Sequence, residues 1–364
     1  MLRFSIQPPL NTFMKSIALL FLGLPGLVHA AEAQPGVISS DFIYTSAPFP
    51  SCHASTIAET PGGLVAAWFG GTEEKHPDVA IYVSRQEEGK WQVPVEVANG
   101  KQPEGKRVPC WNPVLFQPPG GPLILFYKAG PTPETWWGMQ QSSKDNGRTW
   151  GAASRLPGSL IGPVKNKPVI LSDGSWLAPS SSETTANPSV WRVHFERSAD
   201  EGRTWTSTGP VHDGAKFSAI QPSILFTGGE SLLAVGRTRQ GRLFQIASAD
   251  LGRTWGAMSA ASLPNPNSGT DAVTLKDGRH LLIYNHTSRG RSPLNLAISS
   301  DGKTWRAAAV LENEPGEYSY PALIQAADGK VHATWTWKRE RVKHAVIDPK
   351  QLVPRNLVDG KWPK

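Results

Sequence analysis

Apolar residues in this chain come in short runs that pair across tight turns. Six such pairs recur: 54–57 with 64–67, 112–116 with 123–126, 168–171 with 176–178, 222–225 with 232–235, 272–275 with 281–284, and 322–324 with 331–334. Several intervening turns, such as Gly62-Gly63, Asp173-Gly174 and Asp277-Gly278, favour β-hairpins because these residues accept turn conformations. No long stretch shows the ~3.6-residue period of an amphipathic helix. The pattern predicts an all-β fold built from six strand-turn-strand units.

A repeated motif, Ser-x-Asp-x-Gly-x-Thr-Trp, sets the period of these units. It occupies residues 143–150, 198–205 and 248–255, with a shorter copy at 299–305 and a weak one at 84–91. The successive motif tryptophans are 59, 55, 50 and 50 residues apart. A period of about 50 residues suits a four-stranded propeller blade and is too long for helical repeats. Asp and Gly make the tight turn, and the Trp is expected to fill the gap between neighbouring sheets. We therefore predict a six-bladed β-propeller in which the motif is structural.

The N-terminal residues have the pattern of a signal peptide. Lys15 precedes an apolar run at 17–24, and Val28-His29-Ala30 ends it with small residues, as cleavage sites require. We expect residues 1–30 to be removed by cleavage after Ala30, with Ala33 as the alternative, and residues 31–364 to form a single propeller domain. The apolar run is too short to span a bilayer, so the mature protein is expected to be periplasmic or secreted, without a membrane span.

Charge and composition limit the classes of ligand that the protein is expected to bind. The chain has a net charge of +7 and a pI of about 9.4, which favours anionic ligands. No basic run or nucleic-acid-binding signature is present, so an anionic glycan is expected and nucleic acid is not. The nine His residues lack zinc-type spacing, so we expect no metal and no cofactor. Cys52 and Cys110 form either a disulfide or two buried free thiols. We expect a monomer.

The repeated motif resembles the Asp-box of sialidases, and the chain resembles the bacterial BNR-repeat branch of that superfamily. This resemblance implies three arginines that hold a sugar carboxylate, a tyrosine nucleophile activated by a glutamate, and an aspartate as general acid and base. Tyr318 in Tyr318-Ser319 matches the tyrosine. Arg289 falls at the third arginine, Arg237 or Arg239 at the second, and Asp78 at the aspartate, with Glu74 as the alternative.

Two positions depart from the sialidase pattern. His53, in Cys52-His53-Ala54, stands where the first arginine is expected, and Gln221 stands where the glutamate is expected. Gln cannot take a proton from tyrosine, so Glu317 or Asp271 would have to replace it. His53 can act as an acid or base near neutral pH. The chain in this respect resembles a divergent sialidase-like branch marked by residues 49–55, 165–168 and 264–269.

Propeller sites lie at one end of the axis, where innermost strands begin and second strands end. The residues expected there as substrate-binding groups are Arg289, Arg237, Arg239, Lys165, Lys167, Gln221, Asp271, Tyr320 and Asn112, beside the catalytic candidates Asp78, Tyr318, His53 and Glu74; Glu183 is a further position at this mouth. The main hypothesis is an exported glycoside hydrolase acting exo on sialic acid or a related 2-keto-3-deoxy acid. The alternatives are a polysaccharide lyase or atypical glycosidase using a His/Tyr pair, and a non-catalytic glycan-binding propeller.

Overall fold

The computed structural model describes residues 1–2, 5 and 34–363 of the chain. The predicted signal peptide, residues 1–30, lies outside the described residues except at positions 1–2 and 5. Every regular element within the described residues is a β-strand. Among these residues, no helix has the length and apolar content needed to cross a membrane.

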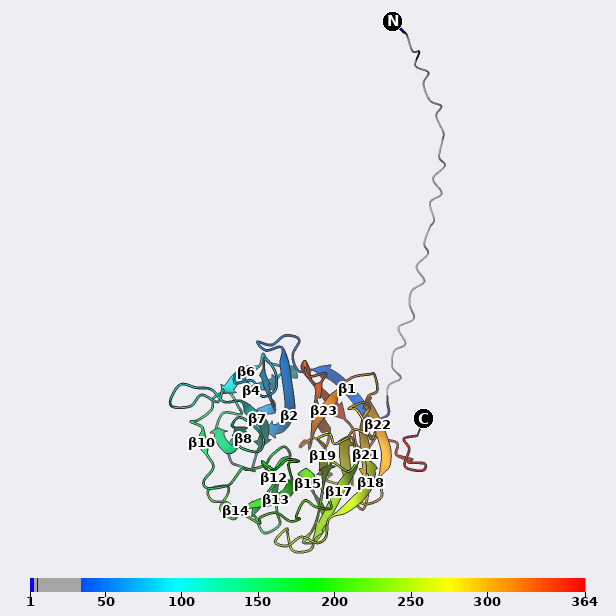
Figure 1. Ribbon diagram of the computed structural model, residues 1–364. Helices are drawn as coiled ribbons and strands as arrows, with labels where there is room; N and C mark the ends of the chain where they lie inside the picture. The colour runs from blue at the N-terminus through cyan, green and yellow to red at the C-terminus, as the bar shows by residue number, and fades with distance from the viewer. Residues whose placement is uncertain (3–4, 6–33, 364) are drawn as a thin grey trace. The chain divides into compact units, whose positions relative to one another are not determined.

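The strands form six antiparallel sheets arranged as blades around an axis, with β2, β7, β15, β19 and β23 surrounding the centre (Figure 1). The innermost strands of blades 1 to 6 are β2 (Ser51–Thr60), β7 (Cys110–Phe116), β11 (Val169–Ile170), β15 (Ala219–Gly228), β19 (Asp271–Thr274) and β23 (Tyr318–Gln325). The second strands are β3 (Gly63–Gly71), β8 (Leu123–Ala129), β12 (Trp176–Glu183), β16 (Ser231–Thr238), β20 (His280–Tyr284) and β24 (Val331–Trp337). The six-bladed propeller predicted from the sequence is confirmed.

The outer strands complete each blade. The third strands are β4 (Ala80–Glu87), β9 (Trp137–Ser143), β13 (Trp191–Ser198), β17 (Arg242–Ser248), β21 (Leu294–Ser299) and β25 (Arg341–Ile347). The fourth positions hold β5 (Lys90–Trp91) with β6 (Val95–Ala98), β10 (Ser154–Arg155), β14 (Thr206–Ser207), β18 (Ser259–Pro264), β22 (Arg306–Glu312) and β1 (Val37–Phe42). A short strand near the C-terminus, β26 (Arg355–Asn356), adds to β22. Blade 6 is thus completed by β1, which pairs with β25.

Each Asp-box is the hairpin between a third and a fourth strand. In blade 4, Asp250 accepts bonds from the backbone N–H of Thr254 at 2.8 Å and from its hydroxyl at 2.6 Å. The Ser248 hydroxyl donates to Asp250 at 2.8 Å and accepts from the N–H of Gly252 at 2.8 Å. The motif tryptophan then packs on the preceding blade, since Trp255 stacks on Phe195 of blade 3 with ring centroids 4.0 Å apart.

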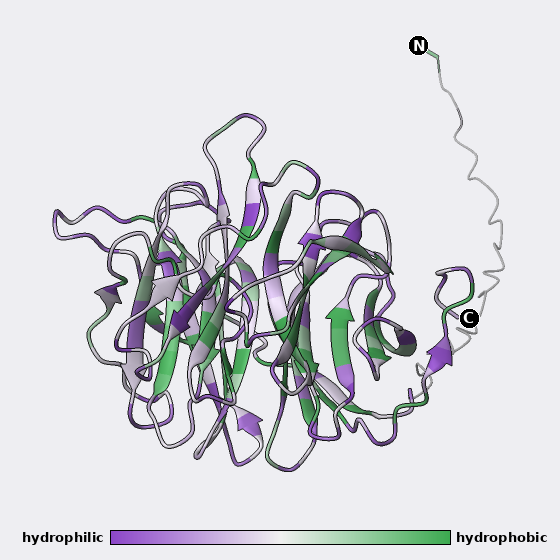
Figure 2. Cartoon of the chain, turned by 90° about the horizontal axis from the view of Figure 1, so that it is seen from below, coloured by the Kyte–Doolittle hydropathy of each residue, from purple (hydrophilic) through white to green (hydrophobic). Residues whose placement is uncertain are grey.

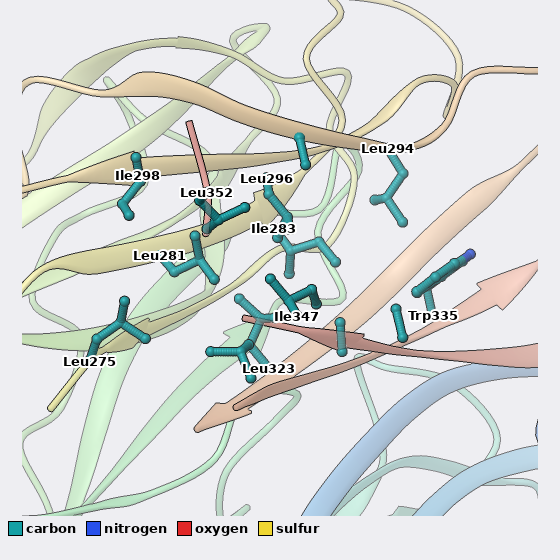
Figure 3. Close-up of a cluster of buried hydrophobic side chains, with 14 of the residues drawn as sticks. Leu275, Leu281, Ile283, Leu294, Leu296, Ile298, Leu323, Trp335, Ile347 and Leu352 are labelled. Atoms are coloured by element: carbon teal, nitrogen blue, oxygen red, sulfur yellow. The ribbon is translucent and has the colours of Figure 1, made fainter. Parts of the chain in front are cut away.

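The apolar core is divided into clusters at the seams between blades. The cluster between blades 5 and 6 contains Leu281, Leu296, Leu323 and Trp335 among its buried members, and Figure 3 shows their side chains meeting between the strands. In the side view, apolar positions lie along the strands while many of the loops at both ends are polar (Figure 2). Burial of one such leucine contributes about 1.5–3 kcal/mol, so the seams hold the blades in fixed relative positions.

Candidate functional site

Four innermost strands contain a sharp bend at one residue. Ala54, Asn112, Gln221 and Tyr320 have φ values of 58°, 38°, 59° and 50°, and the pairing with the second strand shifts register at each of them. A left-handed conformation at a non-glycine residue costs about 1–3 kcal/mol and is typical of functional sites. Three of the four precede a proline in the sequence, which is unusual because proline restricts the residue before it.

Tyr320 is the residue at which several blades meet. Its ring packs against His53 of blade 1, with centroids 4.2 Å apart. Its hydroxyl accepts a hydrogen bond from Arg237 of blade 4 at 2.9 Å. In the circular order of the blades, blade 5 lies between blades 4 and 6. The hydrogen bond between Arg237 and Tyr320 therefore passes near the propeller axis. Tyr320 therefore lies where a propeller site is expected.

Arg237 is held between two aromatic rings. Its guanidinium lies 5.1 Å from the centroid of Trp191 and 5.3 Å from that of Tyr320. It donates to the carbonyl of Asn267 at 3.1 Å, while its buried Nε has no partner. Among residues 34–363 no carboxylate forms an ion pair with Arg237, although Glu183 lies near enough for the charge of Arg237 to act against the rise of its pKa. The guanidinium therefore has no direct acidic partner.

His53 is a buried imidazole beside a group of cations. It is 2% exposed, and its Nδ1 has no hydrogen-bond partner in the described part of the chain. Burial lowers the pKa of His53 well below its usual value, and Arg339, Arg291, Arg237 and Lys165 lower it further. His53 is therefore neutral at physiological pH.

Two further arginines belong to an ion-pair network of the site. Arg291 and Arg339 bind the same Glu317 oxygen at 2.7 Å and 2.9 Å. Arg339 also binds Glu74 at 2.6 Å. The carboxylates of Glu74 and Glu317 are thus neutralised by arginine, and Arg291 in addition lies 5.9 Å from the Tyr320 ring centroid.

Tyr318 and Arg289 lie away from this group. Tyr318 is 1% exposed and belongs to the apolar cluster between blades 5 and 6; burial, Glu312 and Glu314 raise its pKa. Arg289 is exposed in a turn, where its carbonyl accepts a bond from the Thr287 hydroxyl at 2.9 Å. The tyrosine and arginine at the axis are instead Tyr320 and Arg291, each two residues farther along the chain.

The lysines of blade 3 reach across the axis. Lys165, 3% exposed, donates to the Asn166 side chain at 2.9 Å and to the Thr270 carbonyl at 2.8 Å. Burial lowers the pKa of Lys165 to about 7. Lys167 forms an ion pair with Asp271 at 2.9 Å.

Asp271 is saturated by protein partners. Its carboxylate also accepts bonds from the Ser223 hydroxyl at 2.9 Å and from the backbone N–H groups of Ala272 and Leu323, both at 2.8 Å. Together with the Lys167 ion pair, these bonds join blades 3, 4, 5 and 6. Asp271 therefore has a structural role, because it links these four blades.

Asp78, Glu183 and Arg239 lie around this centre. The Asp78 side chain is 39% exposed and bonds the Thr72 hydroxyl at 2.7 Å. Burial acts to raise the pKa of Asp78, but hydrogen bonds from Thr72 and His76 outweigh it and lower the pKa. Glu183 differs, because burial and the nearby Glu134 raise its pKa against the effect of Arg237 and Arg239. Arg239 is exposed and lies 3.9 Å over the Trp191 ring.

Buried polar atoms without a partner gather in the same region. They include His53 Nδ1, Gln221 Oε1, Arg237 Nε, Asn267 Oδ1 and Thr270 Oγ1. Native proteins leave few such groups unpaired, so a concentration of them calls for an explanation. Water or a polar ligand would have to supply these bonds. Asn112, 5% exposed, stands at the equivalent bend of blade 2.

Sequence reasoning missed Arg291 and Trp191 as members of this group. Arg291 belongs to the same loop as Arg289, and only the course of that loop distinguishes them. Trp191 pairs with Glu183 in the β12–β13 ladder, so the hairpin register was the signal that could have found it. The x-Pro dipeptides at Asn112, Gln221 and Tyr320 likewise mark the bends.

Metal ligands and a disulfide are not features of the described residues. No group of three or more His, Cys, Asp or Glu side chains there could hold a metal ion. Cys52 and Cys110 are both free and buried, which corresponds to the second of the two alternatives considered. Burial raises the pKa of each thiol to about 12, so neither is a nucleophile at neutral pH.

Comparison with known proteins assigns the family. The BNR repeat-like domain matches residues 62–333, more than half of the chain. The chain belongs to this BNR-repeat family. A search of curated proteins by sequence found no match.

Solved structures show that this BNR-repeat protein has the sialidase fold. A protein of unknown function from Dyadobacter fermentans has a TM-score of 0.73 at 18% identity, with 86% of this chain and 99% of that chain covered. The NanB sialidase from Streptococcus pneumoniae has a TM-score of 0.67 at 12% identity, with 86% of this chain and 71% of that chain covered. The intramolecular trans-sialidase from Ruminococcus gnavus has a TM-score of 0.68 at 14% identity, with 87% of this chain and 99% of that chain covered. At these identities the likeness concerns the fold, and it confirms the predicted sialidase-like propeller.

Proposed function

We propose that this BNR-repeat protein is a sialidase-like glycosidase that removes a terminal carboxylated sugar, with Arg237 on the sugar carboxylate and Tyr320 at the reacting carbon. The observation that carries the proposal is the placement of Arg237. It is fixed between Trp191 and Tyr320, it donates to the Tyr320 hydroxyl, and it has no acidic partner among the described residues. A guanidinium held in this way suits a planar carboxylate.

The chemistry assigned to Tyr320 is nucleophilic. Its oxygen forms a bond to the anomeric carbon as the glycosidic C–O bond breaks, and the leaving oxygen takes a proton from a carboxylic acid. Water then releases the sugar and restores the tyrosine. The phenol proton needs a base, and the neutral imidazole of His53 packs against the phenol ring. His53 would thus take the role that the sequence leaves open by placing Gln221 where a glutamate is expected.

The test compares two tyrosines two positions apart. The mature protein is incubated with an aryl glycoside of sialic acid, alongside Tyr320→Phe and Tyr318→Phe. We expect Tyr320→Phe to lower kcat at least about a hundredfold, because the nucleophile is lost. Tyr318→Phe removes a hydroxyl at a blade seam and should keep kcat within a few-fold. Measurement of both Tm values controls for folding.

Other outcomes would assign a different role to the site. Loss of activity in Tyr318→Phe alone would place the chemistry at the sequence-predicted tyrosine. Absence of cleavage by the wild type, combined with sialic acid binding that Arg237→Met weakens, would indicate a glycan-binding propeller. Absence of both cleavage and binding would remove the assignment of a carboxylated sugar.

Elimination is a second candidate, and the pair of His53 and Tyr320 favours it. A lyase removes the proton on the carbon next to a uronate carboxylate and breaks the neighbouring C–O bond. A carbon–carbon double bond forms, and the leaving oxygen gains a proton. No water is consumed, and no carboxylate beside the tyrosine is needed, which agrees with Gln221. A rise in near-ultraviolet absorbance with uronate polysaccharides would identify this reaction.

The proposal includes export, which rests on the leader pattern in residues 1–30. Expression of the full chain in a Gram-negative host should yield a periplasmic or secreted protein whose first residue is Ala31, or Gln34 if the alternative site is used. N-terminal sequencing after cell fractionation measures this. An uncleaved chain in the cytoplasm would contradict it.

A further inference from the structure

The backbone around Tyr320 is anchored from two other blades. The Tyr320 carbonyl accepts a bond from the Ser55 hydroxyl of blade 1 at 3.3 Å. The next carbonyl, that of Pro321, accepts a bond from the Lys165 ammonium of blade 3. Both peptide groups that follow the bend are therefore held by side chains from outside blade 6.

Lys165 is fully engaged in this anchoring. Its Nζ reaches the Asn166 side chain at 2.9 Å, the Thr270 carbonyl at 2.8 Å and the Pro321 carbonyl. These are three acceptors for the three N–H bonds of an ammonium group. Lys165 is also 3% exposed, so it has neither a free donor nor an open path to a ligand.

The lysine stem and the Tyr320 ring both border Gly269. A Cβ atom added at Gly269 would lie 3.2 Å from Tyr320 Cδ2 and 3.3 Å from Lys165 Cε. The absence of a side chain at Gly269 therefore leaves room for both the lysine stem and the tyrosine ring. Removal of the ammonium would free the peptide after Pro321, one residue beyond Tyr320, whose φ of 50° is a conformation that non-glycine residues seldom adopt.

We infer that Lys165 is a positioning residue that holds Tyr320 in its left-handed conformation, so that the hydroxyl stays on Arg237, and that it does not itself bind the sugar. The inference rests on the proposed role of Tyr320. Without the ammonium, the bend relaxes toward the extended conformation that a residue before proline prefers. The tyrosine oxygen then moves away from Arg237, and a displacement of about 1 Å at a reacting group can cost about a hundredfold in rate.

The first test is kinetic and uses Lys165→Met, which keeps the length of the side chain and removes its donors. On the sialic acid aryl glycoside we expect kcat to fall about a hundredfold, while KM changes less than about threefold because Arg237 remains. The control is Lys276→Met, since Lys276 also donates to two carbonyls of blade 6, those of Ala326 and Ala327, both at 2.9 Å. It should retain kcat. Equal losses in both variants would show a general effect on folding and overturn the inference.

The second test does not depend on turnover. The six tyrosines are replaced by 3-fluorotyrosine, and the ¹⁹F resonance of Tyr320 is assigned by its loss in Tyr320→Phe. In Lys165→Met this resonance should shift or split while the other five stay in place. An unmoved Tyr320 resonance overturns the inference, whether or not the protein cleaves a glycoside. If wild type cleaves nothing but Tyr320 moves, the positioning stands and the proposed function fails.

A milder variant covers the possibility that Lys165→Met does not fold. Ser55→Ala releases only the Tyr320 carbonyl, so it should shift the same resonance by a smaller amount and lower kcat less. An unchanged resonance in Ser55→Ala, with Lys165→Met unfolded, would count against the anchoring of Tyr320.

Discussion

The two candidate acids Asp78 and Glu183 differ in how firmly they hold a proton. Asp78 has a lowered pKa, whereas burial and Glu134 raise the pKa of Glu183. A general acid has to be protonated at the working pH, and a raised pKa achieves this. Glu183 is therefore better suited electrostatically to protonate the leaving group than Asp78, the residue that matches the sialidase pattern.

Leaving-group dependence separates these two residues. Loss of a general acid harms substrates with poor leaving groups and spares activated ones. We expect Glu183→Gln to lower kcat on an unactivated sialoside by about 10²–10⁴-fold and on the aryl glycoside by less than about tenfold. Asp78→Asn should affect the two substrates to the same small extent. If Asp78→Asn instead shows the strong dependence on the leaving group and Glu183→Gln does not, Asp78 is the general acid and Glu183 has no part in this step.

The sequence could place a tyrosine at the site but could not choose between Tyr318 and Tyr320. Alternate residues of a regular strand face the same side, so the two appear equivalent in the sequence. The bend at Tyr320 breaks that regularity, and Tyr318 packs into the seam instead. Arg289 and Arg291 pose the same difficulty, because a loop has no period from which the direction of a side chain could be predicted.

At the scale of the element, the Asp-box hairpin closes on a few strong hydrogen bonds. Ser248 is central in blade 4, since its buried hydroxyl links Asp250 to the turn N–H of Gly252. Bonds to a carboxylate contribute more than bonds between neutral groups. The hairpin in turn carries Trp255, which covers Phe195 of blade 3. A defect in one turn should therefore weaken the contact between two blades.

Ser248→Ala should lower the free energy of unfolding by about 1–3 kcal/mol, because it removes a charge-assisted bond and leaves the Gly252 N–H unpaired. Urea denaturation measures the change. Ser300→Ala, at the exposed variable second position of the blade 5 motif, is the control and should change the free energy by less than about 0.5 kcal/mol. A Ser248→Ala variant as stable as this control would show that the bond network contributes nothing.

Hairpins were the predictable elements, because alternating apolar runs and turn dipeptides identify them. Blade 3 departs from the pattern. The apolar run at 168–171 becomes the two-residue strand β11 (Val169–Ile170), since Pro168 cannot donate to a ladder and Lys165 anchors the preceding segment across the axis. Outer strands such as β10 and β14 are short and exposed, so they leave no apolar pattern in the sequence.

At the scale of the whole molecule, the ring closes at the seam between blades 6 and 1. His332 and His344 stack there with ring nitrogens 3.0 Å apart, and Trp91 of blade 1 donates to His344 at 3.3 Å. Burial lowers the pKa of His332, and burial together with His332 lowers the pKa of His344 to about 3. The closed seam therefore favours neutral imidazoles.

Acid should weaken this seam before it titrates most carboxylates. Below about pH 6.5 the two histidines bind protons in the unfolded chain, whereas in the folded protein their lowered pKa values keep them neutral. Stability is therefore full above that pH and falls as the pH decreases toward the folded pKa values. We expect a steeper loss of unfolding free energy between pH 7 and 5 in the wild type than in a His332→Gln/His344→Gln variant, measured by urea titration. Equal slopes would show that the pair does not titrate with folding. Other buried histidines, such as His53, keep some slope in both proteins.

Completion of blade 6 by β1 determines the order in which the chain can fold. Val37 pairs with Ile347, so this contact spans nearly the whole propeller sequence and carries a large loop-closure entropy. Proteins rich in such distant contacts fold slowly. During synthesis, β1 emerges first and its partner β25 nearly last, so β1 stays an unpaired edge throughout. A chain that stops before β25 would expose that edge permanently, and exposed edges are the sites at which β-rich chains join one another.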